Sequence, residues 1–214
     1  MATADRLREL YERMYDRLGP QGWWPGDSPF EVMVGAVLTQ NTNWKNVERA
    51  IDNLKGAGLL APDKLVDLPT GLLAEYIRPA GYYNIKAGRL HNLLGAIDRS
   101  HQGDLETFLG QPLPDLRQQL LAVKGIGPET ADSILLYAAN QPVFVVDTYT
   151  HRILSRHQLI DENAGYSDIQ ELFMDNLEAD AHLFNEYHAL LVRVGNRFCK
   201  KQRPDCDACP LSGL

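Results

Sequence analysis

Hydrophobic positions recur at helical spacing along most of this chain, and they predict a series of helices separated by turns. Residues 1–18 predict an amphipathic helix whose apolar side consists of Leu7, Leu10, Tyr11, Met14 and Leu18. Residues 29–54 predict a nearly all-apolar helix, a break at Asn41-Thr42-Asn43 and a second helix. Further helices are expected as two short elements within 62–97, and over 148–159, 167–178 and 181–198.

Little in the sequence predicts β structure. The only strand-like run is the short stretch Val143–Val146, which is rich in β-branched residues. Residues 19–30 and 100–114 are too rich in glycine, proline and polar residues for regular structure, and they predict loops. The chain is therefore predicted to be all-α.

One stretch in the middle of the chain contains a sharp break between two helical patterns. A helix ends at Val123, the chain turns through Gly125-Ile126-Gly127, and a second helix begins at Pro128. Proline and an acid, here Glu129, both suit a helix N-terminus. Because nothing bulky shields the backbone N–H groups at such a turn, they can bind a phosphate. This pattern is a helix-hairpin-helix, although a plain helix cap with no ligand would also contain Gly-x-Gly.

Composition and charge narrow the class of protein. A chain of 214 residues with 44% hydrophobic and 23% charged residues can form one large or two small globular domains. No apolar run could span a bilayer, so no membrane partner is expected. The charged N-terminus is unlike a signal peptide, so a cytoplasmic location is expected.

The net charge of −7 disfavours a general nucleic-acid binder, but the charge is unevenly distributed. Residues 161–186 contain eight acids and no lysine or arginine, whereas residues 193–203 contain five bases and no acid. A protein divided in this way can still present one positive face to DNA. A solvated basic helix end is the simpler alternative.

All three cysteines lie near the C-terminal end, with the spacing Cys199-x6-Cys206-x2-Cys209. Their clustering favours a metal site over buried thiols, and an odd number in a cytoplasmic chain disfavours disulfides. Zinc would need a fourth Cys or His, while a [4Fe–4S] cluster is normally held by four thiolates.

Two motifs, KGIGPETADSILLYA and VFVVDTYTHR, together resemble the endonuclease III superfamily of DNA glycosylases, and the likeness extends from Trp23 to Cys209. The resemblance implies a two-domain all-α fold. A six-helix barrel domain with the helix-hairpin-helix would cover 27–141, and an N/C-terminal helical domain with a cysteine-rich metal loop would cover 1–26 and 142–214. It also implies a base excision repair enzyme of the nucleoid that binds double-stranded DNA containing a damaged base and works as a monomer.

The resemblance assigns roles to individual residues. Asp147 matches the catalytic aspartate, although it would equally suit the N-cap of the following helix. Gln40, which could simply cap its helix, matches a glutamine that enters the gap left by the extruded nucleotide. Tyr82 falls at the wedge position of the family's second hairpin, with plain packing in the loop as the alternative. The other expected DNA-binding residues are Lys124, Gly125, Ile126, Gly127, Lys200, Lys201 and Arg203.

One position departs from the strand-cutting members of the superfamily. Those members have a lysine two residues after the second glycine, whose amine attacks C1′ and forms a Schiff base. This chain has Glu129 there, and a carboxylate cannot form the imine. The prediction is a monofunctional glycosylase that leaves an abasic site, although a substitute role for Lys124 stays open.

The aromatic residues resemble those of the 3-methyladenine glycosylase branch. That branch's base pocket maps to Trp24, Pro25 and Trp44, with Trp23 adjacent. Alkylation at N3 or N7 makes a purine cationic, and aromatic rings favour a cation between them. A cationic base is also a good leaving group that pairs weakly, so its extrusion costs less. The tryptophan pair could instead plug the core.

The cysteine spacing matches the family's cluster loop, whose fourth cysteine follows after five more residues, a position directly after Leu214. The resemblance favours a structural [4Fe–4S] cluster that holds the basic loop, with zinc or an empty site as alternatives. For the whole protein, the alternatives to an alkylpurine glycosylase are an oxidised-pyrimidine glycosylase with lyase activity and a non-catalytic DNA-damage binding module.

Overall fold

The computed structural model describes residues 2–214, and these residues form helices joined by loops, with no β-strand among them. The all-α prediction is confirmed. The chain divides into two compact units, one containing the chain up to Trp24 with Asn140–Leu214, the other containing Pro25–Ala139. Domain limits were expected at residues 27 and 141, and that division into domains stays a prediction. Met1, where the first helix was expected to begin, lies outside the described residues.

The unit Pro25–Ala139 is built around its first helix. Its elements are α2 (Pro29–Leu38), α3 (Trp44–Gly56), α4 (Pro62–Val66), α5 (Thr70–Tyr76), η1 (Arg78–Ala80), α6 (Tyr83–His101), α7 (Leu105–Leu109), α8 (Leu113–Ala122), α9 (Pro128–Ser133) and the π-helical turn η2 (Ile134–Ala138). Helix α2 is buried along almost its whole length, and α3, α6, α9 and η2 pack against it. It begins where the Ser28 side chain accepts a hydrogen bond from the Glu31 N–H (3.2 Å).

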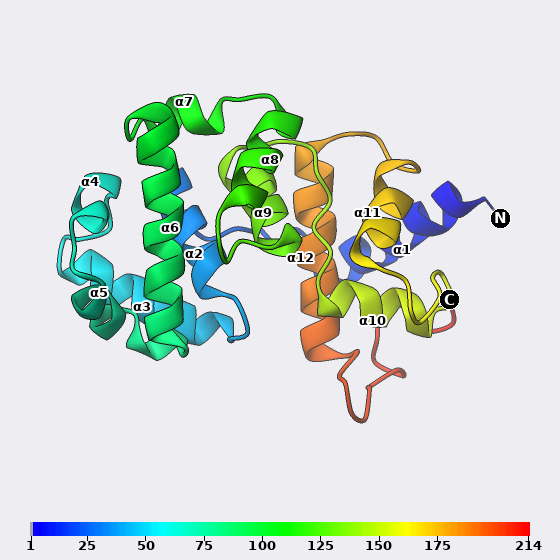
Figure 1. Cartoon of the computed structure of the whole chain (residues 1–214). Coiled ribbons are helices and arrows are strands. Elements are labelled where there is room, and N and C mark those ends of the chain that lie inside the picture. Colours follow the sequence, from blue (N-terminus) through cyan, green and yellow to red (C-terminus); the bar gives the residue numbers. More distant parts are fainter. Residues whose placement is uncertain (1) are drawn as a thin grey trace. The chain divides into compact units, whose positions relative to one another are not determined.

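Helix α6 is much longer than the sequence pattern predicted. Its 19 residues span about 28 Å, and it packs against α2, α4, α5 and α7 (Figure 1). The prediction of two short helices was wrong here because the buried face of α6 includes a lysine, Lys86, which interrupts the apolar pattern. The expected loop 100–114 was also wrong in part, since Asp104 caps the short helix α7 by accepting the Thr107 N–H (3.0 Å).

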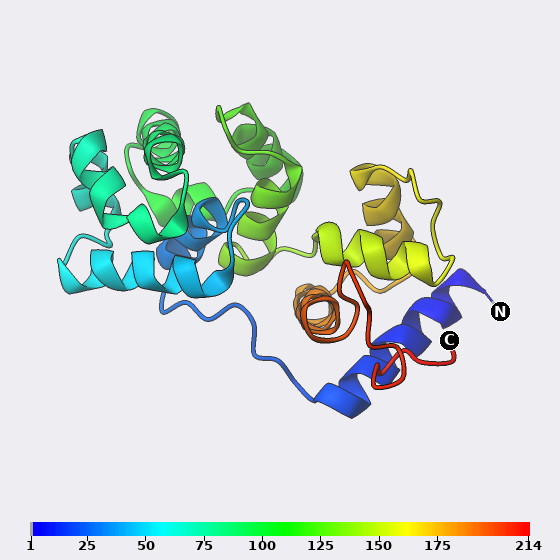
Figure 2. The same ribbon diagram turned by 90° about the horizontal axis from the view of Figure 1, so that it is seen from below.

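The other unit contains α1 (Thr3–Leu18), α10 (Thr148–Arg156), α11 (Tyr166–Met174) and α12 (Ala181–Arg197). Helix α12 packs against both α1 and α10. The Tyr187 hydroxyl on α12 donates to the Leu7 carbonyl on α1 (2.8 Å). The C-terminal segment lies beside α1 (Figure 2), where Arg13 donates to the Ser212 carbonyl (3.3 Å).

The strand-like run Val143–Val146 is buried and lies outside any helix, but it pairs with no strand among the described residues. The Phe144 ring stacks on Phe173 with ring centroids 3.7 Å apart. The Gln170 side chain donates to the Phe144 carbonyl (2.6 Å), so a side chain satisfies a backbone group that a neighbouring strand would otherwise pair. The run leads directly from the core of its unit to Asp147.

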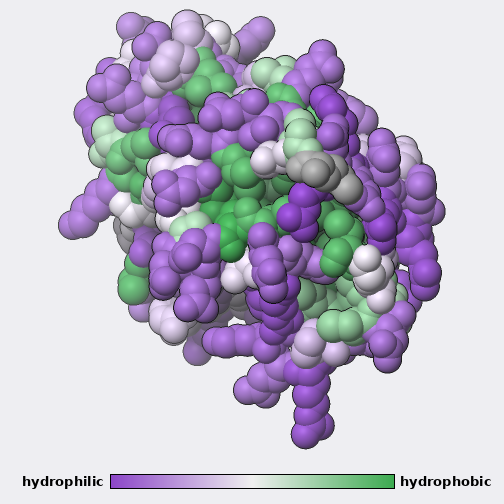
Figure 3. Space-filling view, turned by 90° about the vertical axis from the view of Figure 1, so that its right-hand side faces the viewer, coloured by the Kyte–Doolittle hydropathy of each residue, from purple (hydrophilic) through white to green (hydrophobic). Residues whose placement is uncertain are grey.

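In the space-filling view, hydrophilic side chains cover most of the visible surface and apolar residues group in patches between them (Figure 3). Among the described residues, no helix has both the length and the apolar character needed to cross a membrane.

Candidate active site

The main hairpin joins α8 to α9. Gly125 adopts a left-handed conformation (φ +97°), which a glycine adopts without strain. The Ile126 N–H donates to the Val123 carbonyl (3.0 Å), and the Ile126 side chain is only 5% exposed, so it anchors the turn. In the described chain, the N–H groups of Gly125 and Gly127 donate no hydrogen bond, and both residues are exposed. These amides, next to the exposed Lys124, suit an anionic ligand such as phosphate.

Arg89 on α6 packs directly under this turn. A Cβ atom placed on Gly125 would lie 2.5 Å from Cγ of Arg89, so the close approach also requires glycine. This contact could not be predicted from the sequence, because Arg89 lies on a helix whose extent the hydrophobic pattern did not predict.

The Gln40 side chain is bound to the same hairpin. Its amide nitrogen donates to the Gly125 carbonyl (3.2 Å) and to the Thr130 hydroxyl (2.9 Å). Its amide oxygen accepts a hydrogen bond from the Arg89 guanidinium. Gln40 therefore does not only cap its own helix. Its side chain also links the turn after α2 to the hairpin.

Tyr82 stands at the tip of the second turn, immediately before α6. It follows Gly81 (φ +67°) and itself adopts a left-handed conformation (φ +46°). Its side chain is among the exposed large hydrophobic ones, at 67% relative exposure. If the Tyr82 ring simply packed in the loop, it would be buried. The exposed ring is instead accessible to a partner.

Asp147 caps helix α10 and keeps one oxygen for other contacts. Its Oδ1 accepts hydrogen bonds from the Thr150 N–H (2.7 Å) and the Thr150 hydroxyl (2.9 Å). Its Oδ2 lies 3.8 Å from Nε2 of His188 and accepts no hydrogen bond within the described chain. The side chain is 12% exposed. The structure therefore shows the capping role, and a catalytic role of Asp147 stays a prediction.

His188, on α12, is a neighbour of Asp147 that sequence reasoning missed. Burial lowers the pKa of His188, and the nearby Asp147 carboxylate opposes that shift. The lowered pKa favours the neutral imidazole at physiological pH, so His188 adds no positive charge beside Asp147. The available signal was a histidine at a buried position of an apolar helix, which is more often a core residue than a functional one.

The expected base-pocket residues lie in both units. Trp23 and Trp24 are half-buried, with ring centroids 5.2 Å apart, and Pro25 begins the other unit. Trp44 is the first residue of α3, and its indole N–H donates to Glu48 (2.7 Å). Their joint role as a pocket stays a prediction.

Glu129 is exposed in the first turn of α9, where a carboxylate interacts favourably with the helix dipole. Lys200, Lys201 and Arg203 are all exposed on the loop that follows α12.

Arginines hold this C-terminal loop. Arg156 on α10 donates to the Cys199 sulfur (3.2 Å) and to the carbonyls of Lys200 (2.8 Å) and Lys201 (3.1 Å). Arg152 donates to the Cys199 carbonyl (2.7 Å). Two guanidinium groups therefore hold this loop, and its support by a metal cluster stays a prediction.

The three cysteines do not form a metal site as they are arranged. Cys199 is buried, Cys206 is exposed, and burial raises the pKa of the Cys209 thiol, to which the other two thiols add. Among the described residues 2–214, no three His, Cys, Asp or Glu side chains come together as a metal-binding group. The donors have the right chemistry for iron or zinc, but their placement does not fit a four-thiolate cluster.

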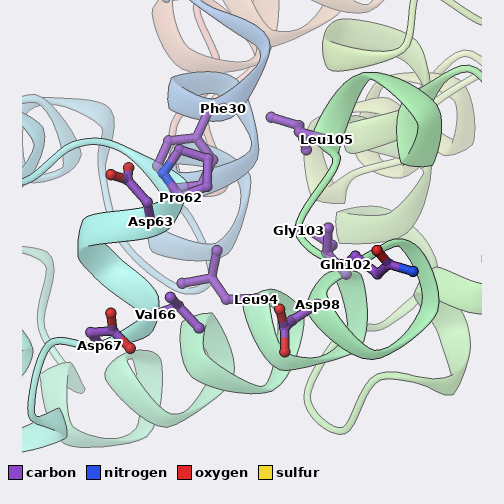
Figure 4. A pocket seen from close by; sticks show the side chains of 11 residues that line it. Phe30, Pro62, Asp63, Val66, Asp67, Leu94, Asp98, Gln102, Gly103 and Leu105 are labelled. Carbon is purple, nitrogen blue, oxygen red and sulfur yellow. The ribbon is translucent and has the colours of Figure 1, made fainter.

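A cavity of about 580 Å³ lies at the far end of α6 from the second turn (Figure 4). Phe30, Leu94 and Ile97 contribute apolar surface, and Asp63, Asp67 and Asp98 also line the cavity. Carboxylates repel phosphate, and the lining includes none of the predicted site residues. This cavity is therefore separate from the candidate active site.

The chain is similar to known repair proteins along its length. A sequence profile described as "HhH-GPD superfamily base excision DNA repair protein" matches residues 34–179. A Methanocaldococcus jannaschii protein named "Putative DNA repair glycosylase MJ1434" is 45% identical over 214 residues, 97% of this chain and 94% of its own length. Endonuclease III of Sulfolobus acidocaldarius is 31% identical over 181 residues, 84% of this chain and 78% of its own length.

The chain is also similar to solved structures of DNA repair proteins. The Helicobacter pylori 3-methyladenine DNA glycosylase MagIII, bound to 1,N6-ethenoadenine, has a TM-score of 0.76 at 33% identity and covers 90% of this chain and 96% of its own. A trapped endonuclease III–DNA covalent intermediate has a TM-score of 0.83 at 22% identity, covering 99% of this chain and 94% of its own, and shows the fold alone. The family predicted from the hairpin and the Val-Asp-Thr motif is confirmed, and the chain belongs to the HhH-GPD superfamily of base excision DNA repair proteins.

Proposed function

We propose that this protein is a monofunctional DNA glycosylase that hydrolyses the N-glycosidic bond of alkylated purines, such as 3-methyladenine, in double-stranded DNA. The observation that carries the proposal is the state of Asp147. Its Oδ1 accepts hydrogen bonds in the helix cap. Its Oδ2 faces the neutral His188 and accepts no hydrogen bond within the described chain. The carboxyl group is thus held in place by the cap, and the neutral His188 adds no positive charge beside it.

Such a carboxylate suits the proposed reaction. Breaking an N-glycosidic bond develops positive charge on the sugar, in a transition state that resembles an oxocarbenium ion. A fixed negative charge stabilises that state, and the same oxygen can orient and deprotonate the attacking water. No covalent bond between the protein and the sugar is required.

The lyase step lacks its usual amine. The position of the Schiff-base lysine holds Glu129, which is exposed in the first turn of α9. Lys86 is a lysine with a lowered pKa, but it is buried and donates to two carbonyl oxygens, so it is not available to a sugar. The hairpin itself carries one exposed lysine, Lys124.

The choice of an alkylated purine rests on the aromatic residues and on one relative. MagIII, 33% identical, is a 3-methyladenine glycosylase with a modified adenine bound in its structure. In this chain, Trp23, Trp24, Pro25 and Trp44 would surround the extruded base, and their electron-rich rings would favour a cationic purine.

The proposal also assigns the contacts with DNA. The amides of Gly125, Ile126 and Gly127, with Lys124, would grip backbone phosphates, and Lys200, Lys201 and Arg203 would add a sequence-independent attraction. Gln40 and Tyr82 would enter the duplex beside the extruded nucleotide. One copy of the chain would suffice for binding.

The first test is release of 3-methyladenine from methylated DNA by wild type and by Asp147→Asn. Asparagine is also a good N-cap, so the variant should fold and bind DNA. Loss of the charge should lower the single-turnover rate by at least about a hundredfold. Asp161→Asn, on an exposed acidic loop, is the matched control and should keep the wild-type rate.

Three results would count against the proposal. Failure of the wild type to release any alkylated purine would sink the substrate assignment. Equal release by wild type and Asp147→Asn would remove the catalytic role of this aspartate, and no release by either, with damage-specific binding intact, would favour the non-catalytic module.

The second test is borohydride trapping on abasic and thymine-glycol duplexes. A monofunctional enzyme forms no imine, so no protein–DNA adduct should appear on a denaturing gel. A trapped adduct would support the lyase alternative, and its loss in Lys124→Met would identify the amine.

A further inference from the structure

One face of α6 carries three polar side chains whose hydrogen bonds end on three different segments of the chain. Lys86, Arg89 and Asn92 are spaced three residues apart, so they lie along one face of the helix. Lys86 donates to the Leu38 and Ala80 carbonyls (2.8 Å each). Asn92 donates to the Lys124 carbonyl (2.9 Å). Arg89, between them, donates to Gln40.

The three segments are the ones that the proposed function assigns to DNA. Leu38 ends α2 two residues before Gln40. Ala80 lies in the turn whose tip is Tyr82, and Lys124 opens the main hairpin. A single helix face therefore holds all three segments at fixed distances from one another.

Lys86 is poorly suited to a purely stabilising role. Its residue is only 1% exposed, and burial with the adjacent Arg89 charge lowers its pKa to about 8. A buried amine is unfavourable by itself, and an apolar side chain of similar size would fill the same space. What the amine adds is a fixed link between the end of α2 and the second turn.

Arg89 joins Gln40 to the main hairpin in a closed network. Its stem lies against Gly125, closely enough that any Cβ there would clash. Its guanidinium binds the Gln40 amide oxygen, and the Gln40 amide nitrogen in turn binds Gly125 and Thr130. Any shift of Arg89 must therefore move Gln40 relative to the phosphate-binding turn.

We propose that Lys86, Arg89 and Asn92 form a positioning ladder. This ladder holds Gln40, the Tyr82 turn and the main hairpin at the relative positions needed to bind damaged DNA. Arg89 acts through Gln40 and touches no reacting atom. The inference rests on the proposed function only in that it takes these segments to contact DNA.

A double-mutant cycle tests this coupling. Affinity is measured for a duplex containing a tetrahydrofuran abasic-site analogue and for the undamaged duplex of the same sequence. Arg89→Met should weaken binding to the abasic duplex by about tenfold, because a charge-assisted hydrogen bond is lost. Binding to undamaged DNA should weaken by less than about threefold, since this reflects general phosphate attraction.

The interaction with Gln40 is isolated in the double variant. In a Gln40→Ala background, Arg89→Met should weaken binding to the abasic duplex by less than about twofold more, because coupled residues are not additive. Arg89→Lys keeps the charge but lacks the planar fork, so it should behave like Arg89→Met on the abasic duplex. Arg99→Met, the same change at an exposed position of the same helix, is the matched control.

The ladder would be overturned by additive effects of the two substitutions, by full rescue by Arg89→Lys, or by equal losses on both duplexes. A wild type with no preference for the abasic duplex would overturn it too. Base release is not the readout, so a wrong substrate assignment would leave this result standing. Additive effects would reject the ladder and leave the glycosylase proposal intact.

Discussion

At the scale of single residues, the buried His188 lies beside Asp147 in the candidate site. The two side chains approach to 3.8 Å, and both are largely withdrawn from solvent. Desolvation disfavours a charged imidazole, and the carboxylate only partly opposes it. The lowered pKa favours a neutral ring, so His188 adds no positive charge beside the carboxyl group to which we assign the reaction.

This arrangement makes folding stability sensitive to acid. The pKa of His188 is lowered in the folded state, so below about pH 6.5 the unfolded chain binds a proton that the folded chain does not. The contribution of His188 is therefore present above that pH and is lost as the pH falls. The stability advantage of wild type over His188→Gln should shrink between pH 7.5 and 5, by at most about 1.4 kcal/mol per pH unit.

Urea unfolding at a series of pH values measures this difference, with His101→Gln as the control at a partly exposed histidine. A difference between wild type and His188→Gln that stays constant over this range would mean that His188 titrates alike in both states.

At the scale of elements, the contact between α10 and α12 depends on one glycine. A Cβ on Gly195 would lie 2.4 Å from Cδ1 and 2.6 Å from Cβ of Tyr149. The Tyr149 Cβ atom cannot swing away as the end of a flexible side chain could, so the helices themselves would have to separate. The same two helices carry Asp147 at the cap and His188.

Gly195→Ala should therefore destabilise the protein by about 1–3 kcal/mol, as overpacking does. Gly88→Ala is the control, because Gly88 is also helical but an added Cβ would meet nothing within 4 Å. That change should stabilise α6 by about 0.5–1 kcal/mol through the higher helix propensity of alanine. The denaturation midpoints in urea measure both, and two changes of the same sign would contradict the packing argument.

The basic loop after α12 could be held in place by a metal cluster or by hydrogen bonds from arginines. The sequence predicted a metal cluster, whereas the structure places Arg152 and Arg156 against the backbone of this loop. Chelation should then leave the melting temperature unchanged, while Arg156→Met should lower it and weaken binding to undamaged DNA. Arg193→Met, an exposed arginine of α12, is the control.

Iron and zinc content before and after chelation completes this test. Release of iron with a fall in the melting temperature would show that the predicted cluster exists and that the cysteines gather around it. Metal-free protein with an unchanged transition would leave the arginines as the support of the loop.

At the scale of the whole molecule, the uneven charge explains how a chain of net charge −7 belongs to a family that repairs DNA. The exposed bases Lys200, Lys201 and Arg203 sit on one loop, while the acids of residues 161–186 lie elsewhere along the chain. Acidic residues also line the cavity at the far end of α6. Net charge is therefore a poor guide to the partner, and the position of each charge is a better one.

The sequence by itself determined the fold class, the family and the local elements of the site. The hairpin and the Val-Asp-Thr motif are built from neighbouring residues, and turn geometry and helix capping are local, so their identity could be predicted. The extent of α6 could not be predicted, because the buried Lys86 breaks the apolar pattern. The carbonyls of Leu38 and Ala80 accept the hydrogen bonds of this lysine.

Only the tertiary structure decided which side chains support that site. The partner of Gln40 lies 85 residues away at Gly125, and that of Arg156 lies 43 residues away at Cys199. His188 reaches Asp147 from another helix. Such contacts depend on how helices pack, and no spacing in the chain records them. Local chemistry was thus fixed by the order of residues, and its surroundings by the packing of elements that are far apart in the sequence.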